Sequence, residues 1–240
     1  MSSYYRIADH IINIINNGNK LSTLSLLPSF VPFKCDNLLN EKILFKLTID
    51  QSVTLIESDK VHHIRAFDTG NGDTVVDRLD NGGYQFLIKN IQGENCVLLI
   101  TNKDFSDCRC RLYGTDNMQR FGLNNALMLV MAFAGSSKDT ILVHASLVRH
   151  NNYGYAFIAK SGTGKSTQVS LWLKYIPNCD LMNDDNPVIR LIDGIPYIYG
   201  SPWSGKTPCY RNVKAPLGAI TRIDRAKTNS VDKLPPIESF

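Results

Sequence analysis

The chain has 240 residues, of which 43% are hydrophobic and 20% are charged, and its formal net charge is +4. This is the composition of an ordinary folded protein, and a chain of this length can bury a sizeable core. The positive charge is small and no Lys/Arg-rich block occurs, which argues against a general nucleic-acid-binding protein.

Neither a membrane span nor a secretion signal is expected. The longest apolar run, ALMLVMAFAG at 126–135, is about half as long as a membrane-spanning helix must be. The first residues, MSSYYRIADH, do not join a basic segment to an apolar one. The six cysteines form no C-x-x-C pair, so we expect buried or half-buried thiols in a reduced, cytoplasmic protein.

Residues 1–115 are predicted to form an antiparallel, β-rich N-terminal module. The segment 4–30 is interpreted as a strand that leads into a turn at Asn17-Gly18, with a short helix as the alternative. The turn compositions DTGNGD and DNGG separate later strands, as in hairpins. These strands are expected at 43–49, 61–67, 74–79, 84–90 and 95–101.

Residues 116–240 are predicted to form a second unit of mixed α/β structure. A helix is expected at 117–135, buried at its apolar C-terminal end and stopped by Gly135-Ser136-Ser137. A hairpin should follow, turning at 150–152, and a further helix is expected at 167–176. The remaining strands are predicted at 179–185, 187–192, 195–200 and 217–223.

The stretch AKSGTGKS, residues 159–166, lies between a predicted strand and a predicted helix. It follows the phosphate-loop (Walker A) pattern G-x-x-x-x-G-K-[ST], with Ala159 in the first position. Glycines let the backbone wrap around an anion, Lys165 can reach the β- and γ-phosphates of a nucleotide, and the Ser166 hydroxyl can bind Mg²⁺. The alternative is a bare turn before a helix. The candidate nucleotide-binding residues are Ser161, Gly162, Thr163, Gly164, Lys165, Ser166 and Thr167.

A pair of acids, Asp184 and Asp185, ends the strand predicted after this loop. One carboxylate can hold Mg²⁺ with Ser166, and the other can take the proton from an attacking hydroxyl. The alternative is a solvated Asn/Asp-rich turn. His144 lies in a strand before the loop, where a single histidine is more often structural than functional.

Together, the segments HASLV at 144–148, AKSGTGKS at 159–166 and NDD at 183–185 resemble the HPr kinase/phosphorylase family. That family shares a phosphate-loop core with the phosphoenolpyruvate carboxykinases. The resemblance covers about residues 140–225 and implies a mixed, bent sheet with flanking helices. It implies that the protein is a Mg-ATP-dependent phosphotransferase in which Lys165 holds the phosphates. The family roles make Asp184 the general base beside His144, and Ser166 and Asp185 the magnesium ligands.

This sequence departs from the family at several points. Thr167 stands where the family often has glutamate, and the second family signature is not recognisable. The expected acceptor is therefore a serine-type hydroxyl on a protein, a peptide or a small molecule, rather than HPr itself. A nucleotide-binding sensor or scaffold with little catalysis, and a carboxykinase-like metabolic enzyme, remain the alternatives.

Downstream, the loop GSPWSGKTPCYRNV at 200–213 combines tryptophan with two cations. Lys206 and Arg211 are candidates to face the transferred phosphate, the alternative being a solvated basic face. The residues LPPIES near the end have the pattern of another helix start, as in a chain truncated at its C-terminus. Nucleic acids and membranes are not expected partners, and an oligomer is left open.

Overall fold

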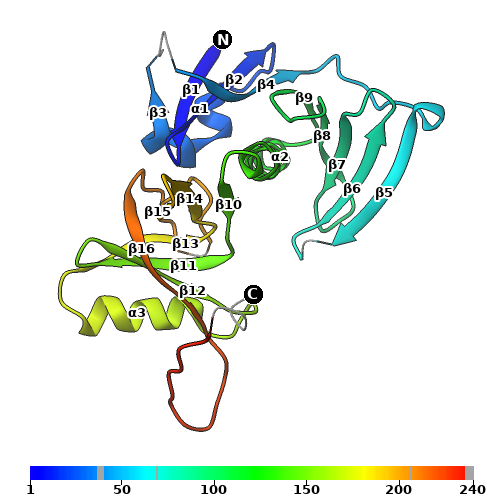
Figure 1. Ribbon diagram of the computed structural model, residues 1–240. Helices are drawn as coiled ribbons and strands as arrows, with labels where there is room; N and C mark the ends of the chain where they lie inside the picture. The colour runs from blue at the N-terminus through cyan, green and yellow to red at the C-terminus, as the bar shows by residue number, and fades with distance from the viewer. Residues whose placement is uncertain (37–40, 69, 206, 236–240) are drawn as a thin grey trace.

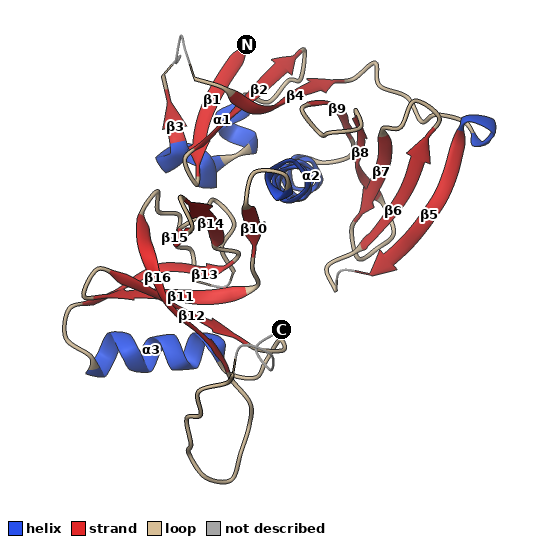
Figure 2. Ribbon diagram, viewed as in Figure 1, coloured by secondary structure: helices blue, strands red, loops and turns tan. Residues whose placement is uncertain are grey.

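The computed structural model describes residues 1–36, 41–68, 70–205 and 207–235 (Figure 1). The protein is mixed α/β, with two mixed sheets and few helices (Figure 2). The helix expected at the end of the chain falls mostly on residues 236–240, which lie outside this description. The two longest helices, α2 (Asp116–Ser136) and α3 (Lys165–Tyr175), confirm the helices expected at 117–135 and 167–176.

The first sheet has nine strands in the order β3-β1-β2-β4-β9-β8-β7-β6-β5. All five strands expected between residues 43 and 101 form. Alternation of apolar and polar residues buries one face of several of these strands, as β4 shows. The strands are β1 Ser2–Ile7, β2 His10–Asn17, β3 Lys34–Cys35, β4 Ile43–Asp50, β5 Val61–Asp68, β6 Asp73–Leu79, β7 Tyr84–Lys89, β8 Asn95–Thr101 and β9 Asp107–Leu112.

The expectation that this sheet is antiparallel throughout is wrong. Strand β4 runs parallel to both of its neighbours, β2 and β9. The segment between β2 and β4 contains two short helices, α1 (Thr23–Leu26) and η1 (Pro28–Phe33), and is long enough for a crossover connection. Hairpin turns reveal which strands pair with their neighbours in sequence, but they carry no information about strands that meet across such a crossover.

The first hairpin turns at Ala8 and Asp9, which both have positive φ angles, of 50° and 59°. This is the backbone of a tight two-residue hairpin turn. The turn expected at Asn17-Gly18 also occurs, where β2 ends and Gly18 has a φ angle of 87°. The N-terminal segment therefore contains two strands and two short helices, where the sequence predicted a strand.

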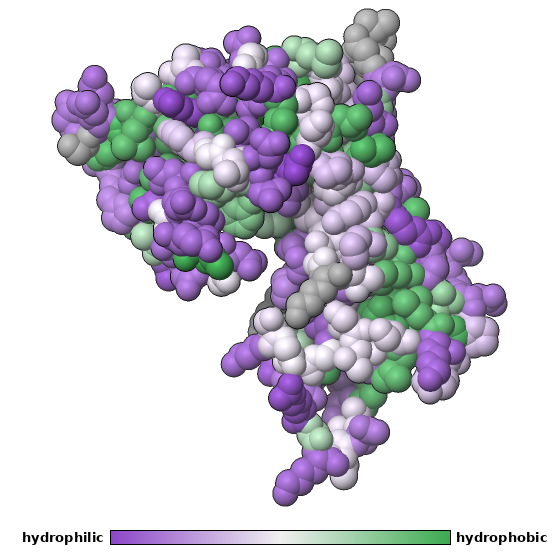
Figure 3. Space-filling view, turned by 180° about the vertical axis from the view of Figure 1, so that it is seen from behind, coloured by the Kyte–Doolittle hydropathy of each residue, from purple (hydrophilic) through white to green (hydrophobic). Residues whose placement is uncertain are grey.

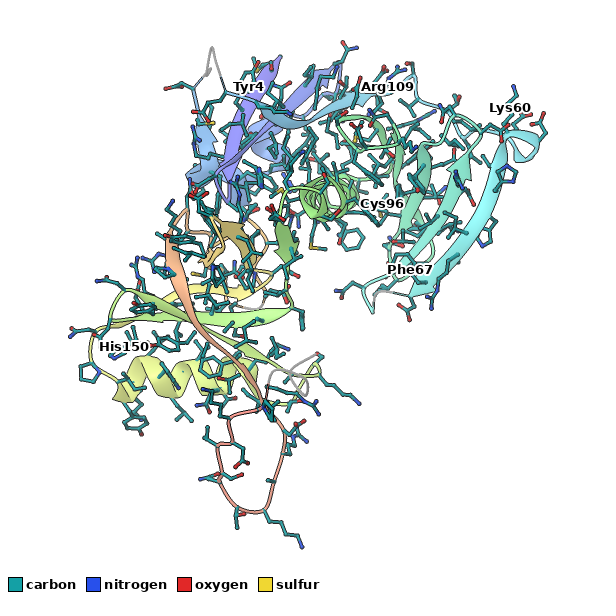
Figure 4. All side chains as sticks on the ribbon, in the orientation of Figure 1. Tyr4, Lys60, Phe67, Cys96, Arg109 and His150 are labelled. Carbon is teal, nitrogen blue, oxygen red and sulfur yellow. The ribbon has the colours of Figure 1, made fainter. Side chains whose placement is uncertain are left out.

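Helix α2 packs against the first sheet. The Thr115 hydroxyl caps its N-terminus by accepting a hydrogen bond from the Met118 backbone N–H. A Cβ atom at Gly122 would lie 2.8 Å from the backbone of Cys96, so only glycine lets the helix approach β8 this closely. Cys96 lies directly beside the helix (Figure 4). The buried face of α2 consists of Gly122, Leu123, Ala126, Leu127, Val130, Met131, Ala134 and Gly135.

The second sheet has seven strands in the order β10-β14-β15-β16-β12-β11-β13, and the β12–β16 pair is parallel. Helix α3 packs beside β11, β12 and β13. The hairpin between β11 and β12 turns at Asn151 and Asn152, as predicted. The strands are β10 Thr140–Leu142, β11 Ala145–His150, β12 Tyr153–Ile158, β13 Cys179–Asp185, β14 Val188–Ile192, β15 Ile195–Tyr199 and β16 Lys214–Arg222.

The turn of the first hairpin contacts the second sheet. The Tyr199 hydroxyl donates to the Asp9 carboxylate at 2.8 Å, and Arg190 donates to the Ala8 carbonyl at 3.0 Å. One hydrophobic cluster runs from the first sheet through α2 to Val188, Tyr199 and Trp203. The predicted domain boundary between residues 115 and 116 stays a prediction. Buried side chains from both sides of this boundary pack together in the same cluster.

His10 is expected to make the stability of this contact depend on pH. Its Nε2 lies 2.8 Å from the Thr140 hydroxyl, and burial, with the nearby Arg190 cation, lowers the pKa of His10 to about 4. An unfolded histidine has a pKa near 6.5, so between these two values the unfolded chain binds the extra proton. The free energy of unfolding should therefore fall as the pH drops from about 7 to about 4, by on the order of 2–3 kcal/mol from this group.

Urea unfolding of the wild type and of His10→Gln at pH 7 and pH 4.5 would measure this effect. The variant cannot titrate at this position, so it should lose less stability on acidification than the wild type does. Equal losses in the two proteins would show that His10 is not responsible.

Two hollows, each lined mostly by apolar side chains, lie on the first sheet and away from the loop at 159–166. The second has a volume of about 350 Å³ and lies between β5–β7 and α2, with Phe67, Phe86 and Phe133 among its lining residues. From behind, apolar side chains form separate patches on a largely polar surface (Figure 3). In the part of the chain described, no helix is both long and apolar enough to cross a membrane.

Candidate active site

The segment AKSGTGKS connects the end of β12 to the start of α3, as predicted. Gly162 and Gly164 have φ angles of 76° and 126°, which side chains other than glycine rarely adopt. A Cβ atom at either position would meet nothing within 4 Å, so the loop is open on these sides. Trp172 anchors α3 to the sheet, with its ring 5.2 Å from Tyr155 and 5.4 Å from Phe157.

The hydroxyl of Ser166 meets the first acid of the pair. Ser166 Oγ lies 3.1 Å and 3.4 Å from the two carboxylate oxygens of Asp184. Ser146 Oγ donates a second hydrogen bond to Asp184, at 2.6 Å. Asp184 is only 6% exposed, so these two hydroxyls stabilise a carboxylate that is largely removed from water. Its position next to the loop is therefore well defined.

Lys165, His144 and Asp185 form a second group. Lys165 Nζ lies 2.9 Å from His144 Nε2, and His144 Nδ1 lies 3.2 Å from an Asp185 oxygen. A lysine ammonium group can only donate, so Nε2 accepts and Nδ1 carries the hydrogen that points to Asp185. Lys165 also donates to the Ala159 carbonyl at 3.1 Å, which holds it back against the start of the loop.

The pKa of Asp185 is higher than that of an ordinary surface carboxylate. Partial burial raises its pKa, and the neighbouring Asp184 carboxylate acts in the same direction, while His144 and Lys165 oppose the shift. Its side chain is still 33% exposed, whereas Asp184 is buried. Asp185 is thus a more basic carboxylate that a molecule from solution can reach.

The structure reverses the expected pairing of the two acids. His144 contacts Asp185, where the family resemblance placed it beside Asp184. Ser166 contacts Asp184, where the resemblance paired it with Asp185. The reason is strand geometry: neighbouring residues in β13 point to opposite sides, and the residue opposite Asp184 in β11 is Ser146.

The loop after β15 closes over the end of β13. Asn183 is fully buried and its amide donates to Ser201 Oγ at 3.1 Å and to the Trp203 carbonyl at 3.1 Å. A Cβ atom on Gly205 would lie 2.8 Å from the Asp184 carbonyl and 3.5 Å from the Asp185 carboxyl carbon. This loop therefore bounds the site, and glycine at 205 permits its close approach to both acids.

Lys206 and Arg211 were predicted to face the transferred phosphate. Arg211 bonds to Asp180 and to the Leu181 carbonyl in the first half of β13, and Asp180 also pairs with Arg149. These contacts occupy Arg211 away from the Ser166–Asp184 contact at the other end of the strand. Lys206 lies outside the described residues.

The two remaining candidate residues, Thr163 and Thr167, lie in the loop and in the first turn of α3. The Thr163 N–H donates to the Lys160 carbonyl at 3.2 Å, which closes a turn over Ser161 and Gly162. Thr167 lies exposed in the first turn of α3. His144 does not lie within a strand as predicted: the chain breaks between β10 and β11, and His144 directly precedes β11. His150 ends β11 and is remote from the loop at 159–166 (Figure 4).

Three residues at the site were missed in the sequence. Ser146 contacts Asp184 because the two residues lie opposite each other in the β11–β13 pair, a pairing that no local pattern reveals. Asn183 and Gly205 position the loop after β15, and their roles depend on packing between distant segments. The available signals were the quoted segments themselves: HASLV contains Ser146, NDD contains Asn183, and the loop at 200–213 contains Gly205.

The side chains beside the loop are oxygen donors, the type of ligand that magnesium takes in proteins. Ser166 Oγ and the nearer Asp184 oxygen already lie side by side, joined by a hydrogen bond of 3.1 Å. Within the described ranges, no three His, Cys, Asp or Glu side chains are grouped to hold a metal. Magnesium commonly takes only one or two protein ligands and completes its shell with water and phosphate oxygens.

No protein-family model matches the sequence, and a search of curated proteins gives no match. The functional assignment therefore depends on the geometry of this site and on the motif resemblance.

Proposed function

We propose that this protein is a Mg-ATP-dependent kinase that transfers a phosphoryl group to a serine-type hydroxyl. One observation carries the proposal: the open glycine loop, the Ser166–Asp184 contact and the Lys165–His144–Asp185 group lie at one edge of the second sheet. These are an anion-binding loop, a magnesium-compatible oxygen pair and a basic carboxylate, which together are the parts that phosphoryl transfer requires.

Ser166 and Asp184 are the residues that would hold the ion. Bound there, magnesium would neutralise charge on the phosphate oxygens. Ser146 keeps the Asp184 carboxylate turned toward Ser166 through its own hydrogen bond. This assignment exchanges the roles that the family resemblance gave to the two acids, because Asp184 is the acid that contacts the loop serine.

Asp185 is the proposed general base. The acceptor oxygen attacks the γ-phosphorus, the bond from that phosphorus to the β,γ-bridging oxygen breaks, and ADP leaves with the electron pair. The hydroxyl proton passes to Asp185, whose raised pKa suits this task. His144 orients the carboxylate through Nδ1–H, and Lys165 turns from His144 toward the β- and γ-phosphates.

The direct test is transfer of label from γ-³²P-ATP in the presence of Mg²⁺. Free serine and a panel of serine peptides would serve as acceptors, and the product would be identified as an acid-stable phosphoserine. We expect transfer by the wild type and none by Lys165→Ala. Tight ATP binding with no transfer to any acceptor would instead indicate a nucleotide sensor, and the kinase proposal would be abandoned.

A further inference from the structure

The segment after β16 reaches the phosphate loop from a distant part of the sequence. Strands β12 and β16 are parallel neighbours, so their carboxyl ends meet at the same edge of the sheet. The phosphate loop follows β12, and residues 223–225 follow β16. The Ile223 N–H donates to the Ile158 carbonyl at 2.9 Å, which continues the pairing as far as the start of the loop.

Arg225 contacts the tip of the loop. Its Nη2 donates to the Gly162 carbonyl at 2.6 Å, a short, charge-assisted hydrogen bond. The next N–H, that of Thr163, donates to the Lys160 carbonyl at 3.2 Å. The Gly162 carbonyl and the Thr163 N–H belong to a single peptide group, so this group is held at both of its ends.

Gly162 is a position where the backbone of the loop needs such support. With no side chain and a φ angle of 76°, it can adopt many backbone conformations, and nothing packs against the position that a Cβ would occupy. Nearby, Arg222 pairs with Asp224 at 3.1 Å, and both side chains are largely exposed. In the described part of the chain, Arg225 is the side chain that bonds to this carbonyl.

We propose that Arg225 is a positioning residue of the phosphate loop, which acts by holding the Gly162–Thr163 peptide in its observed orientation. This inference extends the proposed nucleotide site to a residue 60 positions after Lys165, from a segment with no phosphate-binding motif. A loop that samples more conformations is competent to bind for a smaller fraction of the time, and its apparent affinity falls by that fraction.

Two measurements separate this role from the proposed function itself. The first is amide hydrogen exchange at Thr163 in the protein without nucleotide. Arg225→Ala should raise this exchange rate by about tenfold, the effect of losing one charged hydrogen bond at an exposed position. The second is the affinity for Mg-ATP, which should fall by a similar factor of about ten.

Arg225→Lys and Arg222→Ala are the matched variants. Lysine can still donate one hydrogen bond to the Gly162 carbonyl, so it should recover much of both effects. Arg222→Ala removes a cation three residues away without touching the loop, and it should behave as the wild type. Loss of affinity in Arg222→Ala equal to that in Arg225→Ala would indicate a general charge effect and would overturn the proposal.

The outcomes remain distinguishable if the proposed function fails. Unchanged Thr163 exchange in Arg225→Ala would overturn the positioning role, whatever the protein binds. Faster exchange with unchanged Mg-ATP affinity would also overturn it, because the held conformation would not matter for binding. A wild type that does not bind Mg-ATP would refute the nucleotide site, while the exchange rates would still decide whether Arg225 holds the loop.

Discussion

Replacing Asp185 with asparagine is expected to lower the rate of phosphoryl transfer by about 10²- to 10⁴-fold, the range typical of a lost general base. Asparagine has nearly the same shape and can still accept a hydrogen bond from His144 Nδ1. It cannot take the proton of the acceptor hydroxyl at neutral pH. The affinity for Mg-ATP should change by no more than about threefold, because the loss concerns only the chemical step.

Rates under single-turnover conditions and calorimetric affinities would measure the two effects separately. Asp193→Asn is the control, since Asp193 lies exposed in the β14–β15 turn, where its φ angle of 50° also suits asparagine. A rate for Asp185→Asn within a few-fold of the wild-type rate would remove Asp185 from the role of base.

Replacing Asp184 with asparagine is expected to produce a different defect. The buried carboxylate accepts hydrogen bonds from Ser146 and Ser166, and the asparagine oxygen can accept at least one of them. The negative charge that would bind magnesium is lost. The Mg²⁺ concentration needed for half-maximal activity should rise by about 100-fold or more, since losing even an outer-shell partner of a metal ligand costs about 10- to 100-fold in metal affinity.

Magnesium titrations of the initial rate at saturating ATP would show this shift. Asp184→Asn should move the magnesium dependence, whereas Asp185→Asn should lower the maximal rate with little change in that dependence. If the two variants exchanged these behaviours, the roles implied by the family resemblance would be right and the roles inferred from the contacts would be wrong.

Local patterns predicted the elements of this protein well. The strand–loop–helix around Lys165, helix α2 and most strands follow from hydrophobic periodicity, glycines and turn residues. Each of these elements is determined by residues that are close in sequence, so a local sequence pattern is enough to predict it. The composition also indicated the buried cysteines: Cys108 and Cys110 share one face of β9, and both thiols lie in the core.

Contacts between distant segments could not be predicted in the same way. The parallel placement of β4 depends on a crossover, and the contact of Asp184 with Ser146 depends on the register between β11 and β13. The same register decides which acid faces Ser166. Arg225 reaches the loop only because β16 lies beside β12. Each of these facts requires strand order, which the motifs do not contain.

We propose that the loop at 159–166 binds a nucleoside triphosphate together with magnesium. Calorimetric titration of ATP into the wild type and into Lys165→Ala, each with and without Mg²⁺, would show whether this loop binds the nucleotide. We expect the wild type to bind ATP, more tightly with Mg²⁺, and Lys165→Ala to show no measurable binding. Equal binding by both proteins, or binding by neither, would contradict it.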